Sequence, residues 1–390
     1  MTPTASAVPR HLLPDRPVDL ARIRRRVTED RALAGTAAVG DRTAAVRASV
    51  ARAVRQEGVL LPPATLAALV RDLTDALVGL GPVQALLRDP AVTDVMVNGP
   101  GLVWVERAGS LQRTSVRFDD AEAITAAVRA VLGPLGLRLD TAHPTVDARL
   151  PDGSRLHAVL PPLAPEGPLV TIRRFASVTY GWAELEDGDA VPAQATALLR
   201  GAVAERRAIV VAGRTGTGKT TLLDVLLGEV GGDERVVLIE DAPELRPRNA
   251  HTVRLQTRPP SLDGAGEVTI RELVRQALRM RPTRIVVGEV RGPELVDVLQ
   301  ALATGHEGCM TTVHARAADE ALVRLEGMAL LAGLPLEAAR AQVEIGMDVI
   351  VVLGRGPQGR RGVVEIAEVQ RRGGDGPLRC RPLWQRRVWA

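Results

Sequence analysis

A glycine-rich loop near the middle of the chain constrains the fold more than any other feature. Residues 213–220 read G-R-T-G-T-G-K-T and fill every fixed position of the phosphate-loop pattern G-x-x-x-x-G-K-[ST]. The apolar run Ala208–Ala212 precedes this loop, and the run Thr221–Leu227 follows it. This order predicts a β-strand, a phosphate loop and an α-helix, which is the context that separates a nucleotide site from a chance glycine-rich turn.

The residue types in this loop match the chemistry of a polyphosphate. Glycines let successive N–H groups turn toward a β-phosphate, and the following helix adds its positive N-terminal end. Lys219 can reach the β- and γ-phosphates, and the Thr220 hydroxyl can ligate Mg²⁺. Lys219 is also the only lysine among the 50 basic residues. The predicted cofactors are ATP and Mg²⁺. The predicted nucleotide-binding residues are Gly213, Arg214, Thr215, Gly216, Thr217, Gly218, Lys219, Thr220 and Thr221.

Length and composition indicate several domains without a dominant charged surface. A chain of 390 residues suits two or three domains. Aromatic residues make up only 2% of the chain, so its cores must be built from Leu, Val, Ile and Ala. The net charge is +4, and the pI near 9.9 reflects arginine in place of lysine. These values permit an anionic partner but do not require one.

Two further observations favour a cytoplasmic protein. Cys309 and Cys380 lie far apart and form no C-x-x-C pair, so neither a disulfide framework nor a cysteine zinc module is expected. The sequence contains no run of about 18 apolar residues, and its N-terminus lacks the apolar core of a signal peptide. We therefore expect any membrane contact to be peripheral.

Changes of pattern divide the chain into five segments. Residues 1–17 carry four prolines and predict a flexible lead-in. Residues 18–80 repeat apolar side chains at helical spacing and predict a small bundle of about three helices. Residues 81–180 predict an α+β domain, with a strand at Ser115–Phe118 and a helix capped by Asp119. Residues 181–370 predict the phosphate-loop domain, and residues 371–390 predict a C-terminal tail.

Strands and helices alternate around the phosphate loop. Further strands are predicted at residues 236–239, 285–287, 310–313, 349–353 and 363–369, and helices at residues 192–205, 270–280, 293–303, 317–331 and 336–347. This alternation predicts an α/β domain with a mostly parallel, helix-covered sheet. Its ligand is expected at the carboxyl ends of the strands.

An acidic stretch follows the first strand after the loop. Glu240, Asp241 and Glu244 come at or just after the end of that strand. Carboxylates in this place can hold Mg²⁺ through water or orient an attacking water, and the alternative is that they cap the next turn. We predict a catalytic role for Glu240 and a metal-binding role for Asp241, together with Thr220.

A second acidic strand end has the Walker B arrangement. The strand before Gly288 and Glu289 is apolar, but Gly288 occupies the place where many such enzymes carry aspartate. We therefore predict that Glu289 orients the attacking water, with help from the Glu240 group.

Two histidines flank the next strand. His306 and His314 could hydrogen-bond a phosphate or sense its loss, and each could instead be structural. A shared metal is disfavoured, because an extended chain of this length would hold them roughly 26 Å apart. We predict phosphate sensing for both residues.

Taken in this order, the motifs resemble those of the secretion and type IV pilus motor ATPases, and most closely the branch that serves tight-adherence (Tad/Flp) pili, which also occurs near conjugal-transfer genes. The resemblance runs from about Leu80 to Val369. Its most specific stretches are residues 146–155, 254–260, 267–271, and 278–282 running into 288–292. The acidic stretch resembles the family's Asp box, the Gly288–Glu289 stretch its Walker B, and the histidine stretch its His box. The family's Walker B also ends in Gly-Glu, so Gly288 is no departure.

The resemblance implies a RecA-like ATPase domain preceded by an α+β, PAS-like domain. It also implies a homohexameric ring in which the N-terminal domain closes over Mg·ATP and arginines reach the phosphates. Arg155 and Arg173 stand at the matching positions, with Arg149 and Arg174 as close alternatives. The implied partner is an integral-membrane platform protein of a pilus or secretion system. The implied location is the inner face of the cytoplasmic membrane.

Two other classes of function remain open at this stage. A DNA translocase or conjugal DNA-transfer motor would use the same loop, but aromatics are too few for a base-stacking groove and no dense basic stripe is evident, so no direct nucleic-acid contact is expected. A kinase of small metabolites lacks an evident acceptor pocket and would not explain the large N-terminal domain.

Overall fold

The chain forms two compact units that divide between residues 177 and 178. The computed structural model describes the chain except for residues 1–22, 24–25, 28–29, 31–38, 57–61, 108, 175–179, 259–264, 372–375, 388 and 390. The predicted lead-in at residues 1–17 lies outside the described residues.

The first unit begins with a small group of helices. The helices α2 (Val39–Gln56) and α3 (Pro63–Val78) pack through apolar side chains spaced three or four residues apart. Ile23 and Val27, earlier in the chain, are helical residues buried in the same cluster. Two short 3-10 turns, η3 (Gly81–Gln84) and η4 (Leu86–Arg88), lead from α3 into the sheet.

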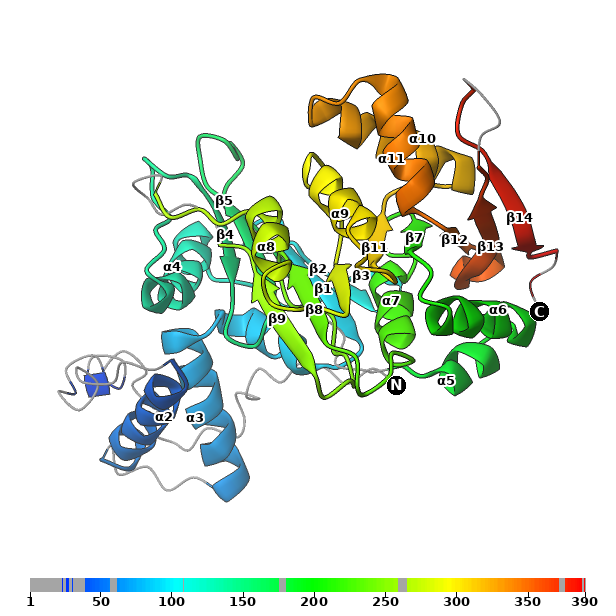
Figure 1. The fold of residues 1–390 in the computed structure, drawn as a ribbon. Coiled ribbons are helices and arrows are strands. Elements are labelled where there is room, and N and C mark those ends of the chain that lie inside the picture. The colour runs from blue at the N-terminus through cyan, green and yellow to red at the C-terminus, as the bar shows by residue number, and fades with distance from the viewer. Residues whose placement is uncertain are drawn as a thin grey trace. The chain divides into compact units, whose positions relative to one another are not determined.

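An antiparallel sheet of six strands completes the first unit (Figure 1). Its order is β3-β2-β1-β6-β5-β4, and α4 (Ala121–Leu132) and the turn η5 (Gly133–Leu135) pack with its apolar side chains. The strands are β1 (Val92–Val97), β2 (Val103–Arg107), β3 (Ser110–Arg113), β4 (Thr145–Arg149), β5 (Arg155–Val159) and β6 (Leu169–Arg173).

Two local predictions in this unit were wrong. The strand predicted at Ser115–Phe118 lies instead at Ser110–Arg113, because the β2–β3 turn is so tight that Arg107 already pairs with Ser110. Val116 and Phe118 are buried in the core without belonging to a strand. The cap of α4 is Asp120, whose side chain accepts a hydrogen bond from the Ala123 N–H at 2.7 Å.

The second unit is built on an eight-stranded sheet in the order β14-β13-β12-β7-β11-β10-β8-β9. The six strands from β12 to β9 run parallel, and β13 and β14 are antiparallel additions at one edge. The strands are β7 (Ile209–Gly213), β8 (Val236–Glu240), β9 (Thr252–Gln256), β10 (Arg284–Val287), β11 (Met310–Val313), β12 (Val349–Arg355), β13 (Arg361–Val369) and β14 (Cys380–Gln385).

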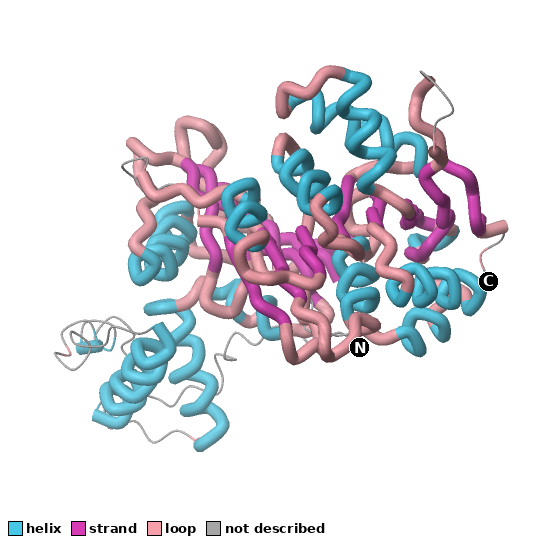
Figure 2. The backbone as a smooth tube through the Cα atoms, viewed as in Figure 1, coloured by secondary structure: helices cyan, strands magenta, loops and turns pink. Residues whose placement is uncertain are grey.

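Helices cover both faces of this sheet (Figure 2). One face carries α5 (Trp182–Asp187), α6 (Ala193–Ala204) and α7 (Lys219–Leu227). The other carries α8 (Ile270–Ala277), α9 (Glu294–Ala303), α10 (Ala318–Leu331) and α11 (Leu336–Gly346). Alternate residues of β7 enter the two cores, which is why its sequence is a continuous apolar run. The helix-covered, mostly parallel sheet agrees with the predicted alternation.

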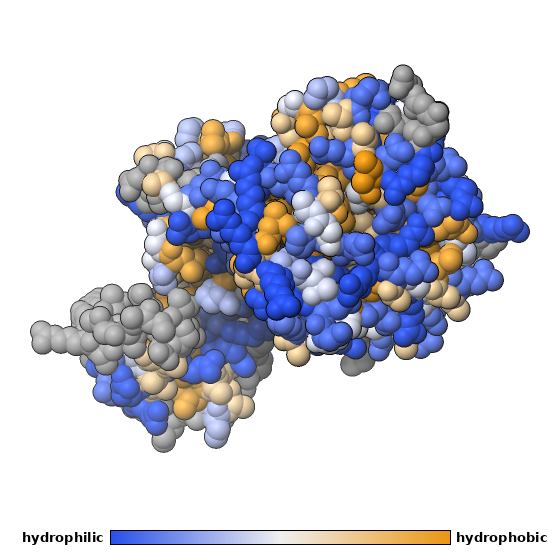
Figure 3. All heavy atoms as spheres, viewed as in Figure 1, coloured by the Kyte–Doolittle hydropathy of each residue, from blue (hydrophilic) through white to orange (hydrophobic). Residues whose placement is uncertain are grey.

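The edges of the sheet differ from the predictions. β9 was not predicted as a strand, and β14 lies in the segment predicted as a C-terminal tail, where it pairs with β13. A short 3-10 turn, η6 (Pro357–Gly359), joins β12 to β13. Apolar side chains are visible on the surface over α9 and α11 in Figure 3, and Leu331 and Ile345 are among the exposed apolar residues. In the described part of the chain, every helix is too short or too polar to cross a membrane.

Candidate active site at the phosphate loop

The phosphate loop connects the end of β7 to the start of α7. Gly216 and Gly218 have φ values of +70° and +98°, which residues with a Cβ rarely adopt. A Cβ on Gly213 would lie 2.5 Å from Thr217 Oγ1 and 3.1 Å from the Leu353 carbonyl oxygen, so this position also requires glycine. The loop glycines are therefore fixed by backbone geometry and close packing.

Lys219 lies over the loop and is largely buried. Its Nζ donates to the carbonyl oxygens of Gly213 and Arg214, at 3.1 and 3.3 Å, and lies 3.3 Å from His314 Nδ1. An ammonium group can only donate, so Nδ1 is the acceptor in that contact. Burial and the Lys219 charge lower the pKa of His314, which favours this neutral form of the ring. His314 is thus brought directly to the loop.

Glu289 lies just beyond the end of β10 and next to His314, which in turn contacts the phosphate-loop lysine. Its Oε2 accepts a 2.6 Å hydrogen bond from Arg291 Nη2. Its Oε1 is 2.8 Å from His314 Nε2 but lacks the alignment of a hydrogen bond, and it is a buried atom with no hydrogen-bond partner among the described residues. Glu289 therefore has one anchored oxygen and one acceptor available to a bound group.

Glu240 ends β8 and is buried. Its Oε1 accepts from the N–H groups of Glu244 and Leu245, at 2.8 and 2.9 Å. Burial raises the pKa of Glu240 to about 7, against the lowering effect of these hydrogen bonds. A Cβ on Gly288 would lie 3.2 Å from Glu240 Cγ. Gly288 therefore leaves room for Glu240, which gives a physical reason for glycine where many Walker B strands carry aspartate.

The candidate magnesium ligands are Thr220, Glu244 and Asp241. The Thr220 hydroxyl donates to Glu244 Oε2 at 3.3 Å, whereas Asp241 accepts from the Thr257 hydroxyl at 3.2 Å. The structure thus pairs Thr220 with Glu244 and not with the predicted Asp241. A hydroxyl and a carboxylate beside a phosphate loop fit Mg²⁺, which is usually bound by one or two carboxylates plus substrate phosphates.

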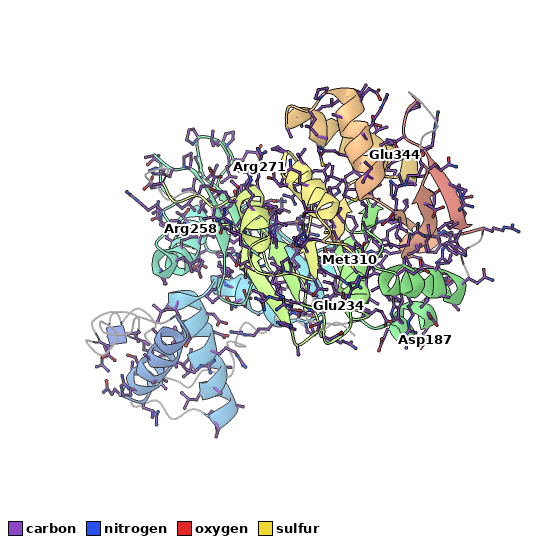
Figure 4. The ribbon with its side chains drawn as sticks, viewed as in Figure 1. Asp187, Glu234, Arg258, Arg271, Met310 and Glu344 are labelled. Carbon is purple, nitrogen blue, oxygen red and sulfur yellow. The ribbon has the colours of Figure 1, made fainter. Side chains whose placement is uncertain are left out.

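His306 lies at the opposite end of β11 from the loop. β11 begins at Met310, labelled in Figure 4, and its parallel pairing sets Met310 against Ile209 and Val313 against Ala212. His306 Nδ1 is 3.2 Å from the Ala301 carbonyl oxygen at the end of α9. The structure therefore brings His314 to the phosphate loop but not His306, which helps to terminate a helix.

The two predicted arginines lie in the first unit, on neighbouring strands. Arg155 on β5 is directly opposite Arg173 on β6 and also opposite Arg149 on β4, so the three lie in one row across the sheet. Asp94 on β1 continues the row, with Oδ1 4.0 Å from Arg173 Nε. Arg174 instead donates to the carbonyl oxygens of Asp89 and Val92. The row concentrates positive charge, while Arg174 is occupied by the backbone.

Sequence reasoning missed the contacts made by Arg291 and Glu244. In the sequence, Arg291 stands out only as part of a family motif, and Glu244 only as one of three acids. The spacing Glu289-Val290-Arg291 could have indicated the Arg291–Glu289 contact. A long side chain two positions after a strand-end carboxylate can fold back and pair with that carboxylate. Nothing in the spacing of Thr220 and Glu244 indicates their contact.

The phosphate loop at the carboxyl edge of a parallel sheet, with Lys219, Thr220 and two strand-end glutamates around it, defines a P-loop nucleoside triphosphatase. The family described as "Type II/IV secretion system protein" matches residues 76–373. The chain belongs to this family, and it is an ATPase. The resemblance to the secretion and pilus motor ATPases, inferred from its motifs, is thereby confirmed.

Individual relatives agree with this assignment. A Mycobacterium tuberculosis protein named for conjugal transfer is 43% identical over 321 residues, which cover 81% of this chain and 91% of the relative. The type IV secretion system protein VirB11 of Brucella suis is 33% identical over 313 residues, covering 71% and 85%. The X-ray structure of the Yersinia pseudotuberculosis ATPase DotB matches with a TM-score of 0.54 at 18% identity, covering 73% and 78%, and shows the shared fold.

Proposed function

We propose that this chain is a Mg²⁺-dependent ATPase motor of a pilus or secretion system, which hydrolyses ATP to ADP and phosphate. The observation that carries the proposal is the meeting of Lys219, His314 and Glu289 beside the phosphate loop, where Glu289 Oε1 lies 2.8 Å from His314 Nε2 and accepts no hydrogen bond from the described residues. The family membership and the conjugal-transfer and secretion names of the relatives support the motor role.

Each of the site residues has a separate role in hydrolysis. Lys219 and the loop N–H groups hold the phosphates, and Lys219 exchanges its present carbonyl contacts for phosphate oxygens. Glu289 aligns water through Oε1, and Glu240 supports the same edge of the sheet. Thr220, with Glu244 or Asp241, would hold Mg²⁺, which neutralises charge on the phosphates when it is bound. Arg155 and Arg173 stabilise the charge that develops on the transferred phosphoryl group.

The assembly proposed is a homohexamer at the inner face of the cytoplasmic membrane. In it, a RecA-like second unit holds nucleotide, a PAS-like sheet in the first unit closes over it, and the segment of residues 18–80 precedes that sheet. Domain closure and reopening during turnover drive an integral-membrane platform protein. The row formed by Arg149, Arg155 and Arg173 supports an anion-facing role for the first unit, because guanidinium groups gathered on neighbouring strands attract a polyphosphate.

The test is the ATPase rate measured against protein concentration, with molar mass determined by light scattering under the same conditions. Specific activity should rise as a ring forms. Added single- or double-stranded DNA should leave the rate unchanged. Strong stimulation by DNA would support a DNA translocase instead, and full activity of a monomer would contradict the ring.

The catalytic assignment is tested with Glu289→Gln. This variant should bind Mg·ATP with nearly unchanged affinity and lose about 100-fold or more in kcat, because the amide cannot accept a proton from water. Unchanged hydrolysis would remove Glu289 from its assigned role.

A further inference from the structure

We propose that Arg291 is a positioning residue for hydrolysis: it anchors one oxygen of Glu289 so that the other is presented to the reacting water. This inference rests on the water-orienting role proposed above for Glu289. It assigns to Arg291 the orientation of a carboxylate, and no direct contact with nucleotide.

The backbone of Arg291 is fixed independently of its side chain. Its N–H and that of Gly292 donate to Glu294 Oε1, at 2.6 and 2.9 Å, at the start of α9. The guanidinium therefore projects from a fixed point between the end of β10 and the first turn of α9. A short arginine–carboxylate contact from such a point defines a direction as well as a charge.

The side chain of Arg291 lies between two strand-end carboxylates. Nη2 donates to Glu289 Oε2 at 2.6 Å, and Nη1 lies 3.9 Å from Asp241 Oδ2. These acids follow β10 and β8, which are neighbours in the sheet. Their mutual repulsion is reduced by the cation between them, so Glu289 can stay charged and in place.

With Oε2 of Glu289 held by Arg291, the second oxygen of Glu289, Oε1, is kept in one place. Oε1 is buried, faces His314 Nε2 at 2.8 Å and has no hydrogen-bond partner among the described residues. Without Arg291, neither oxygen of the carboxylate would be fixed, and Glu289 could rotate about its side-chain bonds so that Oε1 leaves its place 2.8 Å from His314 Nε2 or turns to the Lys219 ammonium. The anchored geometry excludes those rotamers and leaves one acceptor aimed into the site.

Arg291 has little reason to be present for stability alone. Its side chain is 58% exposed, and exposed ion pairs contribute little to folding. Its removal should therefore affect turnover far more than the thermal midpoint of unfolding.

The experiment compares Arg291→Ala, Arg291→Lys and a matched control, Arg200→Ala. Arg200 also makes a 2.9 Å pair with a glutamate, Glu229, and its side chain is 56% exposed, but it lies on α6. Arg291→Ala should lower kcat by about 10-fold or more with KM changed by less than about twofold, and Arg200→Ala should change neither. Arg291→Lys should recover part of kcat. Guanidinium added below denaturing concentrations should also restore part of the Arg291→Ala rate, whereas equal sodium chloride should not.

A double variant separates this inference from the role of Glu289. In the Glu289→Gln background, Arg291→Ala should cause no further loss, because both changes remove the same step. If Glu289→Gln is inactive and Arg291→Ala keeps full kcat, or is not rescued by guanidinium, the positioning role is overturned and the proposed function stands. If Glu289→Gln hydrolyses ATP normally, the water-orienting role of Glu289 fails, and the positioning role of Arg291 fails with it.

Discussion

Gly288 controls the space available to Glu240, and this leads to a prediction at the scale of a single residue. A Cβ on Gly288 would lie 3.2 Å from Glu240 Cγ, which is closer than an ordinary van der Waals contact. Gly288→Asp would add both this clash and a second carboxylate beside a buried acid. We expect kcat to fall by about 10-fold or more, because a shift of the catalytic groups by a fraction of an ångström is costly. Steady-state ATPase kinetics of the Gly288→Asp variant would measure this fall in kcat.

The control for Gly288 is Gly201→Ala. Gly201 lies in α6, and a Cβ there would meet no atom within 4 Å, so this variant should be active and slightly stabilised. If Gly288→Asp retains wild-type kcat, the glycine is not required to accommodate Glu240.

The two cysteines give a prediction about pH. Burial raises the pKa of both Cys309 and Cys380 to about 12. The thiolate is the reactive form, and a raised pKa means that its fraction should keep rising about tenfold per pH unit through pH 10. Cys309 is too buried for a reagent to reach, so labelling of the partly exposed Cys380 is the measurement: it should be slow at pH 8 and accelerate steadily, where an ordinary thiol would level off above its pKa of about 8.5. A plateau below pH 10 in the folded protein would contradict this.

The sequence indicated individual candidate residues most directly where they lie in a contiguous motif. Lys219, Thr220 and Glu289 were found because strand, loop and acid follow one another in the chain. The contact of Arg291 with Glu289 depends on side-chain rotamers, and that of Thr220 with Glu244 depends on how two separate loops meet. The sequence placed both His306 and His314 at the nucleotide edge, because spacing alone does not show which end of β11 lies beside the loop. The parallel pairing of β11 with β7 decides this, and it leaves His306 at the far end.

At the scale of elements, the central strands were predictable and the edges were not. β10 is buried on both faces, and its residues 285–287 therefore read as an apolar run, while β11 is equally buried and keeps β-branched residues at three of its four positions. β14 carries arginine, proline and glutamine, because one side of an edge strand is open to solvent. Its composition resembles that of a tail, and only its pairing with β13 places it in the sheet.

A buried ion pair between β10 and the turn before β8 supplies a stability prediction. Arg284 in β10 is 2% exposed and forms two hydrogen bonds, at 2.8 and 2.9 Å, with Glu234. Arg284→Ala should destabilise the protein by about 3–5 kcal/mol, because it removes the buried cation with both of its hydrogen bonds and leaves Glu234 only its 3.3 Å contact with the half-exposed Arg206. Arg200→Ala, at an exposed pair, should cost less than about 1 kcal/mol. Chemical denaturation measures both, and equal losses would contradict the argument.

The same pair has a defined pH dependence. The hydrogen bonds from Arg284 lower the pKa of Glu234 from 4.5, so the stabilisation is present above pH 4.5 and is lost as the pH falls through the lowered value. The difference in stability between the wild type and Glu234→Gln should narrow below pH 4.5.

At the scale of the whole molecule, the residues that the proposed mechanism uses come from two units. Lys219, Glu289 and His314 belong to the second unit, and the row of Arg149, Arg155 and Arg173 belongs to the first. In the proposed ring, turnover requires closure of the first unit over the nucleotide, and each closure is transmitted to a neighbouring subunit. Inactive subunits should then impair active ones.

Mixing wild-type protein with Glu289→Gln tests this coupling. If sites act independently, activity should fall in proportion to the inactive fraction. If the ring couples them, activity at equal amounts should fall well below half, because most rings would contain several subunits that bind ATP without releasing it. The subunits must be mixed under conditions that allow exchange, which light scattering can establish, and mixtures with Arg200→Ala should remain fully active. A strictly linear decrease after verified exchange would show that each subunit hydrolyses ATP on its own, and the force-generating step would then have to be sought within a single chain.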